Sequence, residues 1–352
     1  MRFSPWPTPL EEWHFLLARE LHGVFDAEAW DARDGILRFR GRLLVDPEEA
    51  FATLSGRVGP LGYVPQLLRP DQIALLRLAP TPQDRGVRRW ALPAALFLAT
   101  IVSTFLVGGL AYAASIMGIL LVHELGHYLT ARYYGMRVSL PYFIPMPLSF
   151  LGTMGAIIRM RSPLPNRRVL FDVGIAGPLA GLAVAIPVTI LGLSLSRVVP
   201  HVADMPGVLQ FGEPVLFRVL AHLVMGPIGS GETILVHPVG FAGWLGFFVT
   251  ALNLIPAGQL DGGHIGYAVL GRRHDKVALV TILALFGMAL YSSLQGQLQV
   301  IWAVWGVLLL MMGYRHPPPL NDLTPLDPAR RVLGILSWGL FLALVTPVPF
   351  VL

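Results

Sequence analysis

The residues best suited to chemistry are two histidines four positions apart, with an acid between them. His123, Glu124 and His127 belong to a His-Glu-Leu-Gly-His motif at 123–127, within a long apolar run. Residues four apart lie on one face of a helix, so the two imidazoles can hold one metal ion while Glu124 lies beside it. The alternative is a pair of core histidines with an incidental acid, but an unpartnered buried carboxylate is costly. Ionisable groups in a membrane helix indicate a functional site.

A catalytic zinc ion usually has three protein ligands, so two histidines leave the set incomplete. The chain has no cysteine, which leaves histidine and carboxylate as candidates. Once the acids of the predicted outer loop, of the loop before the last span and of the basic cluster at 272–276 are set aside, the apolar part of the chain offers Asp172 and Asp261 besides Glu124. Asp261 follows Pro256 and Gly258, which interrupt an apolar segment, and broken helices in membranes mark binding sites. Asp172 follows two arginines and is better explained by an ion pair or a helix-end role.

The composition is that of a membrane protein with several spans. Of 352 residues, 54% are hydrophobic and 13% are charged, whereas soluble domains have about 25% charged residues. The absence of cysteine excludes disulfides and thiolate metal sites. The net charge of +5 could suit nucleic acid, but the arginines follow a membrane topology, and we expect no nucleic-acid partner. The first ten residues lack an apolar run, so we expect no cleavable signal peptide.

Residues 1–88 differ from the rest and predict a small soluble α+β domain. A helix is expected over 10–21, and strands over 25–33 and 36–44 flank the turn signal Asp34-Gly35. Asp46 and Pro47 are suited to the N-cap and first position of a second helix. Two more strands are expected over 63–68 and 73–78, and no catalytic set of residues is visible in this domain.

The remaining sequence predicts six to seven transmembrane helices, since a span needs about 20 apolar residues. The candidate spans are 91–110, 112–134, 169–195, 238–256, 277–294, 298–314 and 332–352. We assign 89–270 to a catalytic core and 271–352 to C-terminal transmembrane helices. The segment 138–166 is rich in proline and glycine, which excludes a regular helix. It predicts a re-entrant, partly β segment beside the site; an interfacial loop on the lipid headgroups is the alternative.

The basic residues predict the orientation of these spans. With residues 1–88 in the cytoplasm, twelve later basic residues lie on the cytoplasmic side and only two, Arg197 and Arg218, lie outside. The twelve are Arg132, Arg137, Arg159, Arg161, Arg167, Arg168, Arg272, Arg273, Lys276, Arg315, Arg330 and Arg331. We therefore expect a multi-pass protein of the cell (plasma or inner) membrane, with its active site toward the cytoplasmic side.

Two motifs together resemble a known family. His-Glu-Leu-Gly-His on one span and Asn-x-x-Pro followed by Leu-Asp-Gly-Gly on a later one, at 253–263, are similar to the site-2 protease family of intramembrane zinc metalloproteases. Ala-Gly-Pro-Leu-Ala-Gly at 176–181 and the glycine-rich 138–166 segment resemble that family too. The resemblance covers roughly 90–270. The family's PDZ and CBS modules have no visible counterpart here.

The resemblance implies one Zn²⁺ per chain, with His123, His127 and Asp261 as ligands and Glu124 as general base. It also implies that Asn253 binds the substrate backbone or the developing oxyanion; the alternative is that Asn253 bonds loose carbonyls near Pro256. His264 could rival Asp261 as a ligand, although a carboxylate completes the family's set. The implied substrates are transmembrane proteins in the lipid bilayer.

Other functions compete with proteolysis. A membrane metal or ion transporter could use His123, His127 and Asp261 as a transit site. A prenyl-protein type of membrane zincin would need a second glutamate at membrane depth besides Glu124, and an inactive relative would not need all of these residues. The soluble domain could bind a regulatory partner, but neither that partner, the substrate nor the oligomeric state can be read from the sequence.

Overall fold

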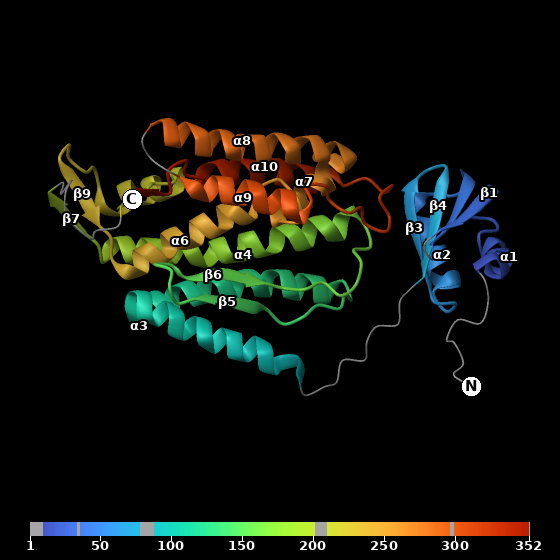
Figure 1. Ribbon diagram of the computed structural model, residues 1–352, viewed down its shortest axis with the longest axis horizontal. Coiled ribbons are helices and arrows are strands. Elements are labelled where there is room, and N and C mark those ends of the chain that lie inside the picture. Colours follow the sequence, from blue (N-terminus) through green and yellow to red (C-terminus); the bar gives the residue numbers. More distant parts are fainter. Residues whose placement is uncertain (1–9, 34–35, 78–87, 201–209, 296–298, 352) are drawn as a thin grey trace. The chain divides into compact units, whose positions relative to one another are not determined.

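The computed structural model describes residues 10–33, 36–77, 88–200, 210–295 and 299–351. The chain divides into two compact units, which are treated separately. The first unit consists of residues 1–84 with two later segments, 163–170 and 317–327, and the second comprises the rest. Figure 1 shows the helices and strands of both units.

The first unit is an antiparallel sheet packed against two helices. Its elements are α1 (Leu10–Glu20), β1 (Phe25–Arg33), β2 (Ile36–Leu43), α2 (Pro47–Val58), β3 (Tyr63–Arg69) and β4 (Gln72–Arg77). The strand order is β1-β2-β4-β3. The four strands lie at the positions that the sequence predicted, within one residue at each end. The expected turn at Asp34-Gly35 lies outside the described residues.

Local signals explain how α2 begins and why it packs on the sheet. The Asp46 carboxylate accepts a hydrogen bond from the Glu48 amide at 2.8 Å, and Pro47 is the first helical residue, as predicted. Leu54 of α2, Phe39 of β2 and other apolar side chains are buried between sheet and helices. This unit is therefore held by an ordinary hydrophobic core.

Two segments from far along the chain complete this unit. The Leu67 amide of β3 donates to the Leu320 carbonyl at 2.7 Å, and the Asp322 amide donates to the Leu67 carbonyl at 2.9 Å. The segment 317–327 thus pairs with the outer edge of β3, and the Leu320 amide in turn donates to the Leu164 carbonyl at 2.9 Å. The sequence-based limit at residue 88 did not anticipate these additions.

The second unit is mainly helical. Its helices are α3 (Arg88–Tyr133), α4 (Arg167–Ser194, whose first residues belong to the first unit), α5 (Val215–Met225), α6 (Pro238–Asn253), α7 (Asp261–Leu270), α8 (His274–Leu294), α9 (Val300–Met312) and α10 (Pro328–Leu344), with the 3₁₀ turn Gly271–Arg273 between α7 and α8. Its strands are β5 (Tyr142–Met146), β6 (Gly152–Ile157), β7 (Arg197–Pro200), β8 (Gln210–Phe211), β9 (Glu232–Leu235) and β10 (Phe350–Val351).

The first long helix, α3, is two helices joined at a kink. It has 46 residues, or about 69 Å at 1.5 Å per residue, far more than a bilayer core of about 30 Å. Gly109 has φ 73° and ψ −173°, which interrupts the helix close to the predicted boundary between spans 91–110 and 112–134. Figure 1 shows the two limbs of α3 running in opposite directions.

The helices of this unit differ in the length of their apolar stretches. Three helical stretches of the described chain are long and apolar enough to cross a membrane: Trp90–Tyr133, Arg167–Ser194 and Asp261–Leu294. Two others that coincide with predicted spans, Pro238–Asn253 and Val300–Met312, fall short of the usual length. The number of crossings therefore stays a prediction.

The last predicted span, 332–352, is wrong at its C-terminal end. Helix α10 begins at Pro328 and ends at Leu344. Pro347 and Pro349 follow, and proline can neither donate a helical hydrogen bond nor allow a helical residue before it. The chain instead forms β10, which pairs with β8. Apolar composition alone concealed this change of structure.

The proline- and glycine-rich segment is an antiparallel hairpin, so its partly β character is confirmed. Strands β5 and β6 pair with Tyr142 opposite Ile157. The hairpin is fastened to α3, because Tyr112 donates its hydroxyl to the Leu151 carbonyl at 2.7 Å and the Ser103 hydroxyl donates to the Gly152 carbonyl. Whether the hairpin enters the membrane stays a prediction.

Candidate metal centre

The second limb of α3 places both histidines of the motif on one buried face. His123 and His127 are 3% and 5% exposed, and their Nε2 atoms lie 3.2 Å apart. A spacing of four residues on a regular helix produces this juxtaposition, as predicted. The face is turned toward α4, where a Cβ on Gly126 would lie 2.6 Å from the Ala176 carbonyl oxygen, so only glycine permits this close approach.

A break between two helices positions Asp261. Helix α6 ends at Asn253 and α7 begins at Asp261, with Pro256 between them. The glycines at 262 and 263 make the break compact: Cβ atoms there would lie 2.0 Å from the Leu254 carbonyl oxygen and 2.4 Å from the Gly258 carbonyl oxygen. The Leu-Asp-Gly-Gly sequence therefore folds the chain back on itself and leaves Asp261 in the first turn of α7.

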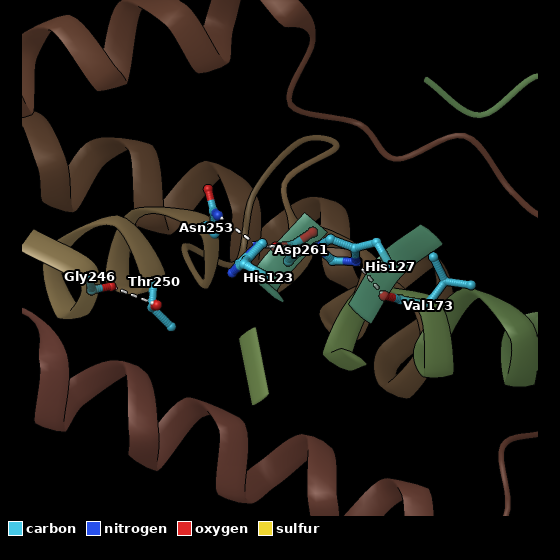
Figure 2. Close-up of polar contacts among 7 residues, drawn as sticks. All are labelled: His123, His127, Val173, Gly246, Thr250, Asn253 and Asp261. Atoms are coloured by element: carbon cyan, nitrogen blue, oxygen red, sulfur yellow. Dashed lines mark hydrogen bonds and ion pairs between the residues drawn. The ribbon is translucent and has the colours of Figure 1, made fainter. Parts of the chain in front are cut away.

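The three side chains converge on one point, as Figure 2 shows. Asp261 Oδ2 lies 3.3 Å from His123 Nε2 and 3.2 Å from His127 Nε2. A tetrahedral zinc ion with bonds of about 2.0–2.1 Å separates its ligand atoms by about 3.3–3.4 Å. The triangle of ligand atoms therefore has the dimensions that zinc requires. Among the described side chains, these three form the one group suited to a metal ion.

A backbone carbonyl sets the protonation of His127. Its Nδ1 lies 2.7 Å from the carbonyl oxygen of Val173 in α4, a contact drawn in Figure 2. A carbonyl can only accept, so Nδ1 carries the proton and Nε2 presents its lone pair to the ligand triangle. Such a partner fixes the ring of a metal-binding histidine and its tautomer. This contact could not be predicted from the sequence, because every residue has a backbone carbonyl.

Three glycines of α4 make room for the centre. A Cβ on Gly177 would lie 2.0 Å from His127 Nε2, and one on Gly181 would lie 3.0 Å from the His123 ring. A Cβ on Gly174 would lie 2.8 Å from the Cβ of His264. Their spacing of three and four places them on one face of α4. The glycine face leaves the histidine nitrogens accessible to an ion, so the residues fit a bound metal.

Glu124 and Asn253 lie next to the ligand triangle. Glu124 is 5% exposed and follows His123 directly on α3. The side-chain amide nitrogen of Asn253, at the end of α6, lies 3.1 Å from His123 Nε2. The structure thus gathers all five residues that the sequence predicted for the site: three at the corners of the triangle, one beside it on α3, and one that contacts it from α6.

The two rival candidates have other partners. His264 Nδ1 lies 2.6 Å from His316 Nε2, outside the triangle. Asp172 accepts two hydrogen bonds from Arg330, each 2.7 Å long, which confirms the predicted ion pair in place of metal ligation. The sequence did not indicate that Arg330, 158 positions away, is its partner.

Comparison with known proteins identifies the family. The model of peptidase family M50 matches residues 111–294, which include the metal centre and the broken helix that carries Asp261. The chain belongs to this family, the site-2 protease family. The predicted family resemblance is therefore confirmed. No solved structure matches the chain.

Several curated relatives from plants are similar to this M50 protein. Probable zinc metalloprotease EGY1, chloroplastic, of Arabidopsis thaliana is 34% identical over 70% of this chain and 44% of its own length. Probable zinc metalloprotease EGY2, chloroplastic, of Oryza sativa subsp. indica is 29% identical over 93% of this chain and 64% of its own length. The chain thus spans less than two thirds of either relative.

Family and structure agree on the class of protein. The M50 family is membrane-embedded, and three stretches among the residues that the structure describes are long and apolar enough to cross a bilayer. This M50 protein is therefore a membrane protein. The family match favours a peptidase over the transporter that the sequence left open.

Proposed function

We propose that this M50 protein is an intramembrane zinc metalloendopeptidase. It would hydrolyse peptide bonds within or near the transmembrane helices of other membrane proteins. The observation that carries the proposal is the triangle of His123 Nε2, His127 Nε2 and Asp261 Oδ2, with edges of 3.2–3.3 Å on apolar helices. One zinc ion per chain suits this set of two imidazoles and one carboxylate.

The residues around the triangle have separate tasks. When bound, zinc lowers the pKa of a coordinated water to about 7 and so supplies hydroxide near neutral pH. Glu124 would accept a proton from the attacking water as general base and return it to the leaving amine as general acid. Val173 keeps His127 in the tautomer that offers Nε2. Burial of Glu124 keeps bulk water away from this proton transfer.

Asn253 is suited to binding the substrate. The single lone pair of His123 Nε2 cannot serve both a metal ion and the Asn253 amide, which lies 3.1 Å away. A bound metal would therefore turn the Asn253 donor toward another acceptor, such as the substrate carbonyl. One donor of this kind can contribute roughly 3 kcal/mol to transition-state stabilisation. The contact with His123 supports this role over a bond to the carbonyls near Pro256.

Strand β6 is suited to receive the opened substrate. A transmembrane helix must unwind locally before its peptide bonds can be cut, and the freed backbone groups need new partners. Strand β6 pairs with β5 in a two-stranded sheet, and its Met154 and Ile157 side chains are 56% and 58% exposed. Strand addition to the edge of β6 that does not pair with β5 would supply those partners.

Proline substitution of two neighbouring residues, Ala156 and Ile157, tests this role. Successive amides of a strand point to opposite edges, so one substitution removes a hairpin bond and the other removes an outward donor. The proline substitution that removes the outward donor should lower cleavage and leave the zinc content unchanged. Equal loss of zinc and cleavage in both variants, or no effect in either, would contradict strand addition.

The activity is tested with purified protein in detergent, model transmembrane peptides and the substitution Glu124→Gln. We expect the variant to retain zinc and to lose cleavage, because Gln cannot accept the proton of water. Glu213→Gln, at an exposed glutamate on the loop before α5, is the matched control and should cleave normally. Persistent cleavage in Glu124→Gln would remove the proposed mechanism. Zinc flux into vesicles without cleavage would favour the transporter.

The cell location and orientation remain part of the proposal. The distribution of basic residues supports a location of the first unit and the active site on the cytoplasmic side of a cell (plasma or inner) membrane. Because the chain has no cysteine, single cysteines at Arg218 and Arg272 can be labelled without background. Labelling of the first from outside and protection of the second is the expected result; the reverse pattern would overturn the orientation. A regulatory partner of the first unit also remains a proposal.

A further inference from the structure

Helix α10 lies outside the family match, and none of its described residues belongs to the ligand triangle. It nevertheless contacts α4 and α7 of the second unit. Arg330 donates from Nε to Asp172 Oδ1 and from Nη2 to Asp172 Oδ2, both at 2.7 Å. This two-pronged geometry is the strongest and most directional arrangement for an arginine and a carboxylate.

The same carboxylate is also held from α3. Tyr134, one residue beyond the end of α3, donates its hydroxyl to Asp172 Oδ2 at 2.6 Å. Tyr134 lies seven residues after His127, which is about two helical turns farther along the direction of α3. Asp172 of α4 thus links the residue that follows α3 to α10 through its carboxylate.

Asp172 is next to the residue that orients His127. Val173 follows it in α4, and the Val173 carbonyl accepts the His127 Nδ1 proton at 2.7 Å. A displacement of the α4 turn that contains Asp172 would therefore displace the partner of His127. Contacts of this kind tune metal affinity as strongly as about 10–100-fold.

One turn after Arg330, α10 also packs on the helix that carries Asp261. A Cβ on Gly334 would lie 2.6 Å from Val269 and 3.6 Å from Ile265, both in α7, and 3.2 Å from Phe171 in α4. Since there is no room for a larger residue, α10 is fixed against α4 and α7 together. The helix therefore contacts the elements that supply both the third ligand and the histidine partner.

We propose that Asp172 is a positioning residue for the metal centre: held by Arg330 and Tyr134, it fixes the turn of α4 whose Val173 carbonyl orients His127. Helix α10 contributes by supplying Arg330, which holds the Asp172 carboxylate in place. This inference rests on the proposed zinc centre and adds to it a contact from α10, which lies outside the family match.

The test is the zinc affinity of the full-length protein in detergent, measured by competition with a chelator, for wild type and Asp172→Asn. We expect about a 10-fold loss of affinity. Cobalt-substituted protein gives a second readout, because its visible spectrum reports ligand geometry independently of activity. That spectrum should change in Asp172→Asn and in Arg330→Met. Arg331→Met, at the exposed neighbouring arginine, is the matched control and should leave both unchanged.

Milder variants keep the inference testable if Asp172→Asn does not fold. Tyr134→Phe removes one hydroxyl, and Arg330→Lys keeps the charge but loses the two-pronged geometry; each should weaken zinc binding less than Asp172→Asn does. Unchanged zinc affinity and cobalt spectrum in folded Asp172→Asn, Arg330→Lys and Tyr134→Phe would overturn the positioning role and leave the proposed centre intact. Failure of wild type to bind zinc would instead overturn the centre itself.

Discussion

In the first unit, large apolar side chains such as Leu54, Phe39 and Leu67 fill the space between sheet and helices and are at most 1% exposed. At the metal centre, Gly126, Gly177 and other glycines bring the helices so close that a Cβ would collide with a neighbour. The core of the first unit is therefore sensitive to removal of atoms, and the centre is sensitive to their addition. Large-to-small substitutions should therefore harm the first unit, and small-to-large substitutions should harm the metal centre.

The largest effect is expected at the centre, for Gly177→Ala. The added methyl would lie 2.0 Å from His127 Nε2, in the space that a metal ion needs. We expect the protein to lose bound zinc and, with it, cleavage activity. Elemental analysis of purified protein measures the first of these.

The matched control is Gly118→Ala, on the same helix as the histidines. A Cβ at this position meets no atom within 4 Å, so the variant should bind zinc normally. Full zinc occupancy in Gly177→Ala would show that the glycine face is not what makes room for the ion.

An intermediate effect is expected in the first unit for Leu54→Ala. Removal of a fully buried leucine side chain should lower the free energy of unfolding of this unit by roughly 2–5 kcal/mol. Hydrogen exchange of the β2 and β4 amides measures this loss. Leu44→Ala, where the leucine is 52% exposed, is the control and should change little. If both variants lost the same stability, the contrast between packed and open positions would fail.

The smallest effect is expected at Tyr134, where polar groups link the helices. Burial, and then the hydrogen bond to Asp172, raise the pKa of the Tyr134 phenol. A raised pKa means that the folded state favours the neutral phenol, so its contribution to stability is present below the ordinary pKa of about 10 and is lost as pH rises through the raised value.

Melting temperatures of wild type and Tyr134→Phe from pH 8 to 11 measure this contribution. Wild type should lose stability more steeply than the variant at the alkaline end. Parallel curves would show that the phenol contributes nothing through its ionisation.

Local patterns made part of this structure predictable. The spacing of His123 and His127, the cap formed by Asp46 and the positions of β1 and β2 depend on neighbours a few residues apart, and the structure matches each. The interruption of an apolar segment by Pro256 and Gly258 pointed to Asp261, and the family resemblance of the Leu-Asp-Gly-Gly sequence implied it as the third ligand.

The remainder depends on how distant elements meet. Arg330 pairs with Asp172 across 158 positions, and nothing near either residue specifies the other. The Val173 carbonyl has no signature in a sequence, and the role of Gly177 depends on the rotation of α4 about its axis. The end of α10 was missed for a different reason: apolar residues continue beyond Leu344, and only the prolines reveal the break.

The edge of β3 has a consequence for biosynthesis. Its hydrogen-bonding partner is the stretch around Leu320, which the ribosome makes some 250 residues after Leu67 itself. The sheet can therefore form early, but its outermost row of backbone bonds must wait until most of the apolar helices have been translated. A nascent chain halted before that stretch would carry this margin unprotected, open to other unpaired strands or to chaperones.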